Sequence, residues 1–198
     1  GKMSIEGNSV GGLMPTAEQI GAAIKADVQK AAPANLLDNS DFRNPVNQRG
    51  KTSYTGAGYT IDRWAAETST VTVKVNDGFI TLSNTTSYGG LGQKLEHYNR
   101  LKGKMATIAV NIDGAIYVQH FKIGENAGGL RFGDTAITFY SVDGGHVLFR
   151  MGSNSSVNIY WVALYEGVYT TETLPEYHPK GYGVELAECQ RYYYQLKS

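Results

Sequence analysis

The sequence predicts an all-β fold, a jelly-roll β-sandwich, with a stem helix before the sandwich and a short helix after it. Short segments alternate apolar and polar residues with a period of two, which is the pattern of strands with one buried face. Gly-containing turn signals separate these segments at short intervals. The composition, with 24 Gly and 14 Tyr among 198 residues, suits strands joined by many tight turns.

The charge balance argues against two classes of partner. The 18 Lys and Arg residues match the 18 Asp and Glu residues. We therefore expect no nucleic acid and no membrane insertion, because the first needs a basic face and no apolar run approaches the roughly 18–20 residues that cross a bilayer. The N-terminal stretch lacks the apolar segment of a signal peptide. Cys189 is the only cysteine, which excludes an intrachain disulfide.

Residues 1–34 are predicted to hold a lead-in and one helix. Thr16 provides an N-cap hydroxyl, and Gln19 completes a capping box. The helix is expected to continue to about Ala32, just before a proline. Its narrow apolar stripe consists of Ala17, Ile20, Ile24, Val28 and Ala31. This stripe would pack either on the chain's own domain or, through Ile20, Ile24 and Val28, on copies of itself around an oligomer axis.

Residues 35–167 are predicted to form the sandwich. Leu37 and Phe42 anchor its start, and an irregular loop follows over residues 43–60. A loop of this length in a compact domain is usually functional or firmly held. Trp64, which ends the loop region, is expected to seal one end of the core rather than to bind a ligand.

Three turn signals predict three hairpins, and about eight or nine strands are expected in all. The turn signals are Asn76-Asp77-Gly78, Asn111-Ile112-Asp113-Gly114 and Asp143-Gly144-Gly145. The clearest strands are 71–75, 79–82, 105–112, 115–123, 135–142, 146–151 and 156–167.

The last of these strands is apolar on both faces. Tyr160 and Trp161 are expected to point to opposite faces, with Ile159, Trp161 and Ala163 facing inward. Because the alternate residues are apolar too, the strand is expected to be buried on both sides, either inside the sandwich or at a subunit interface.

Residues 168–198 are predicted to form a linker and a C-terminal helix, packed on the sandwich or on a neighbouring subunit. The helix is expected over Val184–Gln195. One face of it would carry Leu186, Cys189, Tyr193 and Leu196.

The sequence contains no catalytic or metal-binding motif. Its four histidines form no close pair and no HExxH pattern, and there is no GxSxG elbow. We therefore expect no enzyme, no metal and no cofactor. Two alternatives stay open: Asp38 and Asp41 could hold a structural calcium ion, and paired carboxylates could make a glycosidase. The carboxylates considered are Asp62, Glu67, Glu96, Glu125, Asp134 and Glu166.

Aromatic residues are the best binding candidates, because flat rings stack on the apolar faces of sugars. His120 and Lys122 share one strand face and His146 and Arg150 share another, so that either pair could line a glycan groove. The candidate glycan-binding residues are Tyr88, Tyr117, His120, Arg150 and Tyr160.

Two ends of the chain resemble a known family. NLLDNSDF (35–42), NPVNQRG (44–50) and YTIDRW (59–64) resemble the opening of a domain found in bacteriophage tail-fibre and related virion proteins. GVELAECQRYYYQ (183–195) resembles the end of the same proteins. The resemblance covers most of the chain and marks Asp62-Arg63-Trp64 as a family motif with an expected structural role.

The resemblance implies a carbohydrate-binding-module-like jelly roll in a non-enzymatic part of the virion, at the tail tip. Such a receptor-binding protein is usually a homotrimer, with a host cell-surface glycan and other tail proteins as partners, and this favours the stem interpretation of the helix. One departure is TTETLPEYHPKG (170–181), which is longer than the link in the family. A carbohydrate-binding module of a bacterial glycoside hydrolase and a purely structural virion protein are the alternatives.

Overall fold

The computed structural model describes residues 16–20, 33–125, 127–142 and 144–195, and the chain divides into two compact units, 1–32 and 33–198. In the first unit a helical turn begins after Thr16. The Thr16 N–H donates to Gln19 Oε1 (2.9 Å), and the Gln19 N–H donates to Thr16 Oγ1 (3.2 Å). The predicted capping box is therefore confirmed.

The apolar stripe of this helix stays a prediction. Ile20 is 46% exposed, whereas Ile24, Val28 and the predicted helix end near Ala32 lie outside the described residues.

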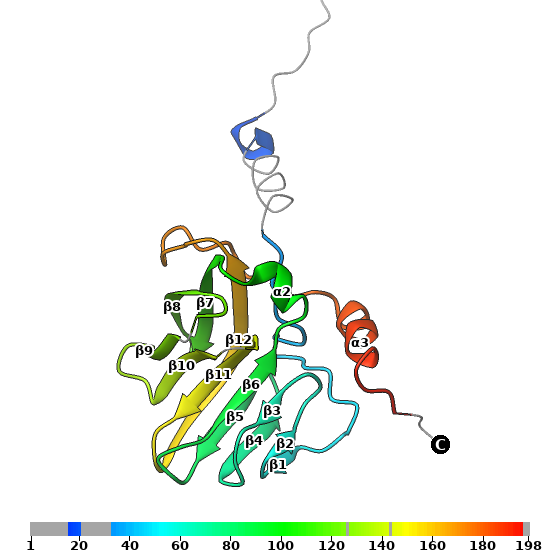
Figure 1. The fold of residues 1–198 in the computed structure, drawn as a ribbon. Coiled ribbons are helices and arrows are strands. Elements are labelled where there is room, and N and C mark those ends of the chain that lie inside the picture. The colour runs from blue at the N-terminus through cyan, green and yellow to red at the C-terminus, as the bar shows by residue number, and fades with distance from the viewer. Residues whose placement is uncertain (1–15, 21–32, 126, 143, 196–198) are drawn as a thin grey trace, which may run out of the picture. The chain divides into compact units, whose positions relative to one another are not determined.

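The second unit is mostly β-structure, with two six-stranded antiparallel sheets that form the two layers of a sandwich (Figure 1). Sheet A has the order β1 (Ser53–Thr55), β4 (Val71–Asn76), β5 (Phe79–Asn84), β12 (Ser155–Glu166), β7 (Met105–Ile112) and β8 (Ala115–Lys122). Sheet B has the order β2 (Gly58–Tyr59), β3 (Ala65–Ala66), β6 (Gly90–Lys94), β11 (His146–Met151), β10 (Ile137–Val142) and β9 (Ala127–Arg131). The prediction of an all-β sandwich is confirmed.

Alternating residues of both sheets fill the space between the layers. Ile137 and Phe139 of β10 face the core, as do Val147 and Phe149 of β11. Trp64 is fully buried, and its indole N–H donates to the Asn39 carbonyl (2.8 Å). The prediction that Trp64 belongs to the core is confirmed.

The three predicted hairpins are present. Asn76 pairs with Phe79, Ile112 with Ala115, and Val142 with His146. Asp113 and Gly114 both have positive φ (50° and 88°), as the tight turn between two twisted strands requires.

The strand count was underestimated, since twelve strands are described. The strands that the sequence did not reveal are β1, β2, β3 and β9. Two of them lie within the predicted irregular loop 43–60, and β2 and β3 have only two residues each, too short to show a period. Strand β9 contains Gly128 and Gly129, which obscure its pattern.

The prediction of which residues in the last strand face inward is partly wrong. The register of β12 shifts between Ile159 and Trp161, and this bulge places both Tyr160 and Trp161 on the outer face of sheet A. Only Ile159 of the predicted inward set faces the main core, whereas Trp161 and Ala163 belong to a second, outer apolar cluster. A bulge adds one residue to one strand and so reverses every facing that follows it.

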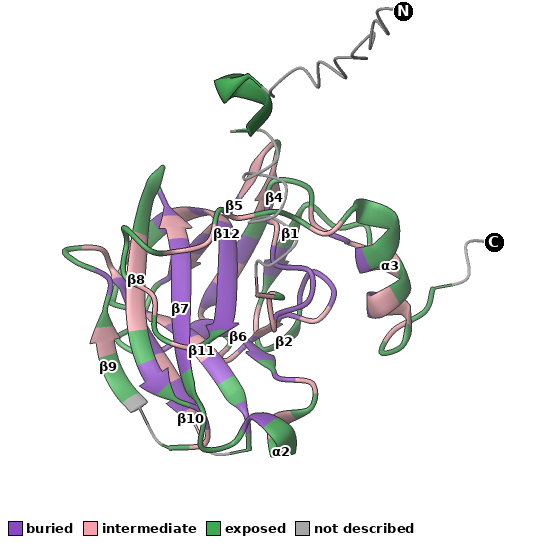
Figure 2. Cartoon of the chain, turned by 90° about the horizontal axis from the view of Figure 1, so that it is seen from above, coloured by how far each residue is buried: buried purple, intermediate pink, exposed green. Residues whose placement is uncertain are grey.

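The outer cluster explains why β12 is apolar on both faces. The Tyr177 ring stacks on Trp161, with centroids 4.5 Å apart and planes 4° from parallel, and Leu174 and Tyr169 pack beside them. The long segment 170–181 thus covers part of sheet A. Figure 2 shows β7 and β12 buried along most of their length.

Two helices are described in this unit, the short α2 (Tyr98–Leu101), which was not predicted, and α3 (Tyr182–Gln190). The predicted C-terminal helix extended to Gln195, which is wrong, because residues 192–195 are not helical. The buried residues of α3 are Glu185 and Cys189. None of the described helices is long and apolar enough to span a membrane.

Candidate ligand groove

The loop after the first apolar anchors is held by one buried amide. Asn39 donates to the carbonyls of Val46 (2.9 Å) and Asp62 (2.7 Å) and accepts the Val46 N–H (2.7 Å). Asp62 in turn accepts the backbone N–H of Gln48 (2.7 Å). Because these polar groups hydrogen-bond to one another, they hold the loop between Asn39 and Asp62 in place.

The C-terminal segment docks on the same motif through polar and cation–π contacts. The guanidinium of Arg63 lies 3.6 Å from the ring centroid of Tyr192, and that of Arg49 lies 3.9 Å from the centroid of Tyr193. Gln48 Nε2 also donates to the Tyr193 carbonyl (2.8 Å). These contacts draw residues 192–193 away from the helical path, which accounts for the early end of α3.

A carboxylate from α3 completes this docking. Glu185 is 6% exposed, and its Oε2 accepts the N–H of Asn39 (2.7 Å). Burial raises the pKa of Glu185 above its ordinary value, although the Asn39 hydrogen bond and the Lys180 charge oppose that rise. Residues 39–63 and 185–193, far apart in sequence, therefore pack against each other.

The outer face of sheet B carries a groove with a volume of about 410 Å³. Its middle is formed by Ala65, Gly92 and Leu148 from three neighbouring strands. A Cβ at Gly92 would lie only 2.3 Å from Leu148 Cδ2, so that glycine lets the leucine lie flat across the sheet. Tyr59, which is 66% exposed, lies at the groove with the Arg49 guanidinium 5.5 Å from its ring centroid.

A cluster around Arg150 forms another part of the groove. The guanidinium makes a bidentate ion pair with Glu67 and lies 4.3 Å and 4.6 Å from the ring centroids of Tyr88 and Tyr140. The Tyr88 hydroxyl donates to Glu67 Oε1 (2.9 Å). Burial alone would raise the pKa of Glu67, but the hydrogen bonds from Arg150 and Tyr88 hold that pKa below its ordinary value.

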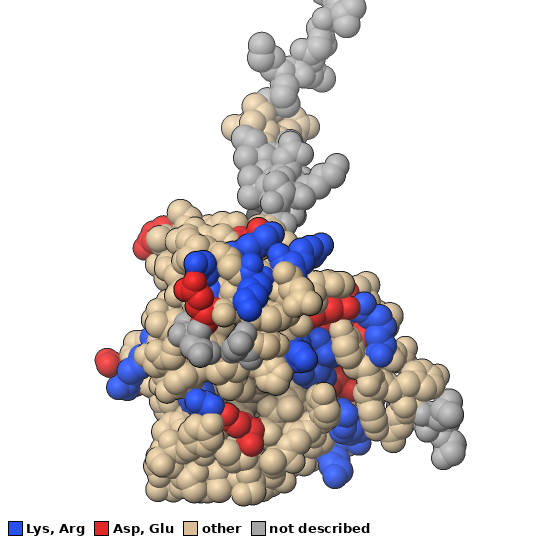
Figure 3. Space-filling model, viewed as in Figure 1, with Lys and Arg blue, Asp and Glu red and all other residues tan. Residues whose placement is uncertain are grey.

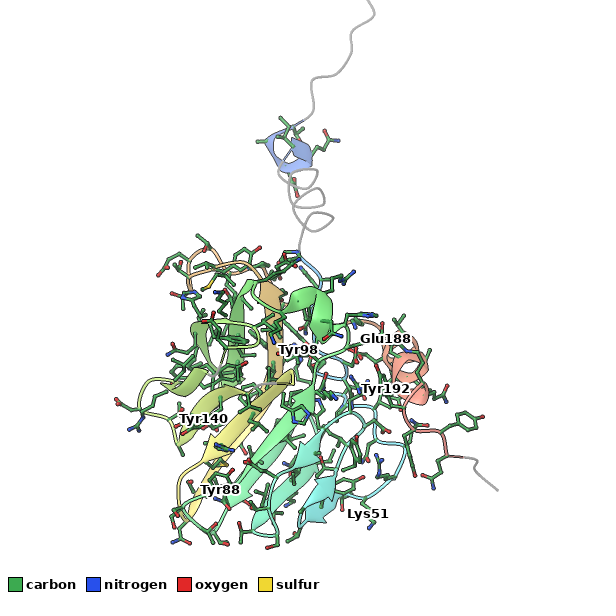
Figure 4. The ribbon with its side chains drawn as sticks, viewed as in Figure 1. Lys51, Tyr88, Tyr98, Tyr140, Glu188 and Tyr192 are labelled. Carbon is green, nitrogen blue, oxygen red and sulfur yellow. The ribbon has the colours of Figure 1, made fainter. Side chains whose placement is uncertain are left out.

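The figures show how these groups lie. Tyr88 and Tyr140, labelled in Figure 4, lie on the same part of the sandwich, whereas Tyr192 lies beside α3. Figure 3, seen from the side of sheet B, shows a largely uncharged surface with a few blue and red groups beside a hollow.

The structure brings together only some of the predicted glycan-binding residues. Tyr88 and Arg150 meet on sheet B, and His146 lines the same groove, as its shared face with Arg150 predicts. The other three lie on sheet A, where Tyr117 packs against Phe132, His120 Nε2 lies 2.6 Å from the Tyr169 carbonyl oxygen, and Tyr160 packs against Phe79.

The sequence did not point to several of the groove residues, among them Tyr59, Lys94 and Leu148. The available signal was the alternation of Gly90 and Gly92 in β6, which leaves one face of a central strand without side chains.

The acidic side chains considered for a calcium site or a glycosidase site mostly pair with cations. Asp38 pairs with Arg63 (2.8 Å) and Asp41 with Arg43 (2.7 Å), and the described residues hold no group of three or more His, Cys, Asp or Glu side chains suited to a metal ion. Most of the carboxylates considered for a glycosidase are likewise engaged by cations. These pairs are Glu67–Arg150, Glu96–Arg191, Glu125–Lys122, Glu166–Lys104 and Asp62–Arg49.

Comparisons with models of known protein families, with curated proteins and with solved structures gave no match. The groove offers an exposed ring, an apolar floor, and several side chains that donate or accept hydrogen bonds. A concave site of this composition suits a ligand that has both apolar faces and polar groups.

Proposed function

We propose that this chain is a non-enzymatic adhesion domain of a bacteriophage tail fibre, a jelly-roll sandwich that binds host-surface glycan in the groove on sheet B. The observation that carries the proposal is the open ring of Tyr59 beside the polar side chains of that groove. The resemblance of residues 35–64 and 183–195 to tail-fibre proteins supplies the virion context. The domain would act on the virion, outside the cell.

A single shallow groove of this kind binds weakly, so adhesion would depend on valency. A homotrimer joined through the helix around Ile20 would present three grooves to one surface, and linked sites gain avidity without new contacts. Ile-rich seams favour assemblies of more than two helices. Other tail proteins would hold the fibre in the virion.

The groove is tested with the full chain on a glycan array, comparing Tyr59→Ala with Tyr194→Ala. Tyr194 is 62% exposed, close to the 66% of Tyr59, but lies outside the groove. We expect Tyr59→Ala to weaken binding about tenfold, since a stacked ring contributes on the order of 1–1.5 kcal/mol. Equal binding by the two variants would contradict the site.

The oligomeric state tests the stem and separates the alternatives. Sedimentation of the full chain at micromolar concentration should give a trimer. A monomer that binds a soluble oligosaccharide would instead indicate the carbohydrate-binding module of a glycoside hydrolase. A trimer that binds nothing on the array would indicate a purely structural virion protein.

A further inference from the structure

The charged side chains of the groove differ in whether a group of opposite charge pairs with them. Arg150 is neutralised by the bidentate contact with Glu67. Arg63 is neutralised by Asp38, at 2.8 Å, and its NH2 donates to a main-chain carbonyl (3.2 Å). Lys94 is exposed and its ammonium group has no hydrogen bond or ion pair among the described residues. The groove therefore has one cation that is free for a ligand.

The sheet register places a second polar group beside this cation. Lys94 of β6 lies directly opposite His146 of β11, and both side chains line the groove. His146 is also exposed, and its imidazole has no partner among the described residues. Cross-strand neighbours on one face lie about 5 Å apart, close enough for both to contact one anionic group.

The two ends of the groove consequently differ. His146, Leu148 and Arg150 follow one another on the same face of β11, so that the Lys94–His146 end and the Arg150 end are roughly 13 Å apart. The Arg150 end is an ion pair held between aromatic rings, which offers hydrogen bonds without net charge. The Lys94 end has a positive charge that no ion pair among the described residues balances.

We propose that the ligand of this groove is an acidic glycan, whose negatively charged substituent is held by Lys94 and His146 while its neutral rings lie over Leu148 toward Arg150. This inference rests on the proposed glycan-binding function and specifies its ligand class. The charged substituent is a carboxylate or a sulfate, since both accept hydrogen bonds from an ammonium group and an imidazole.

The test uses an array on which each acidic glycan is printed beside its neutral counterpart. The pairs are a uronate beside its methyl ester, a sialylated glycan beside the same glycan without sialic acid, and a sulfated glycan beside its unsulfated form, which together separate the sources of charge. The full chain should bind the preferred acidic member two- to fivefold more strongly than its counterpart, the range for one exposed charge pair.

The matched variants are Lys94→Gln and Lys74→Gln. Lys74 is exposed on β4 of the other sheet and forms no ion pair in the described residues. Lys94→Gln should abolish the preference for the acidic member, and Lys74→Gln should keep it. Raising NaCl from about 50 mM to about 500 mM should weaken binding of the acidic member by the wild type but not by Lys94→Gln, because salt screens exposed charges.

Three results separate the two proposals. If the full chain binds neutral and acidic members equally well and Tyr59→Ala loses this binding, the acidic ligand is overturned and the glycan groove is kept. Equal effects of Lys94→Gln and Lys74→Gln would overturn the role of Lys94. A chain that binds neither class would overturn the proposed function and this inference together.

Discussion

At the scale of single residues, Asn39 shows how the entry motif fixes the fold. Its backbone has a φ of 50°, a left-handed conformation that asparagine tolerates better than most residues. From that position its amide reaches both the Val46 backbone and the Asp62 carbonyl. One side chain thus replaces the ladder hydrogen bonds that an irregular loop lacks.

Replacing this amide should therefore be costly. We expect Asn39→Ala to lower the free energy of unfolding by about 3 kcal/mol, because buried backbone groups lose their partners. Asn154 has the same φ of 50° but is exposed, so Asn154→Ala controls for backbone strain and should cost about 1 kcal/mol. Urea unfolding of both variants gives the comparison, and equal losses would assign the effect to strain alone.

At the scale of elements, α3 is attached to the sandwich by charges and rings more than by apolar area. Glu185 accepts the buried N–H of Asn39, and Arg191 makes a two-fold contact with Glu96 (3.0 and 2.9 Å). A helix of nine residues is unstable alone in water, so these contacts decide whether it forms.

The Glu185 contact can be separated from the rest of the helix. We expect Glu185→Ala to cost about 1–3 kcal/mol, because it leaves the Asn39 N–H buried without an acceptor. Glu188→Ala, on the same helix but with a half-exposed ion pair to Lys180, should cost less than about 1 kcal/mol. Hydrogen exchange at the Asn39 amide should accelerate only in the first variant.

The same side chain predicts a pH dependence. The folded-state pKa of Glu185 is raised, chiefly by burial. Its contribution to stability is therefore complete below the unfolded value of about 4.3 and declines as pH rises through the folded value. Glu185→Gln keeps the acceptor and removes the titration. We expect the free energy of unfolding of the wild type, relative to that of this variant, to fall as pH rises from about 4.3 through the folded-state pKa. A constant difference would contradict the prediction.

At the scale of the whole sandwich, the two outer faces differ in how far the chain itself covers them. Part of the outer face of sheet A is covered by the chain itself, where Tyr177 stacks on Trp161. The outer face of sheet B carries the groove and its open tyrosine. Residues 170–181 thus supply part of the cover on sheet A, through Leu174 and Tyr177.

Removing the cover should expose the aromatic layer beneath it. We expect Tyr177→Ala to destabilise the chain by about 2 kcal/mol and to increase quenching of tryptophan fluorescence by acrylamide. Trp161 would account for the change, because Trp64 is fully buried elsewhere in the core. Tyr182→Ala, at a tyrosine that is 47% exposed, is the control, and similar quenching in both variants would argue against the covering role.

The sequence by itself determined the elements whose causes are local. Alternating apolar residues and Asp-Gly turns predict the β4–β5 and β7–β8 hairpins, and Thr16 with Gln19 predicts its capping box, because each pattern acts over a few neighbouring residues. The sequence also contains no local catalytic motif, and it predicts binding through Tyr88, Tyr117, His120, Arg150 and Tyr160, of which only Tyr88 and Arg150 meet.

The tertiary structure alone decided which of these residues meet. A bulge of one residue in β12 reversed the facing of Trp161, and no local pattern announces such a bulge. The groove joins Tyr59 of β2, Lys94 of β6 and Arg150 of β11, strands that are distant in sequence but belong to one sheet. Strand order and register are set by the packing of the whole core, and for that reason the site could not be assembled from sequence positions alone.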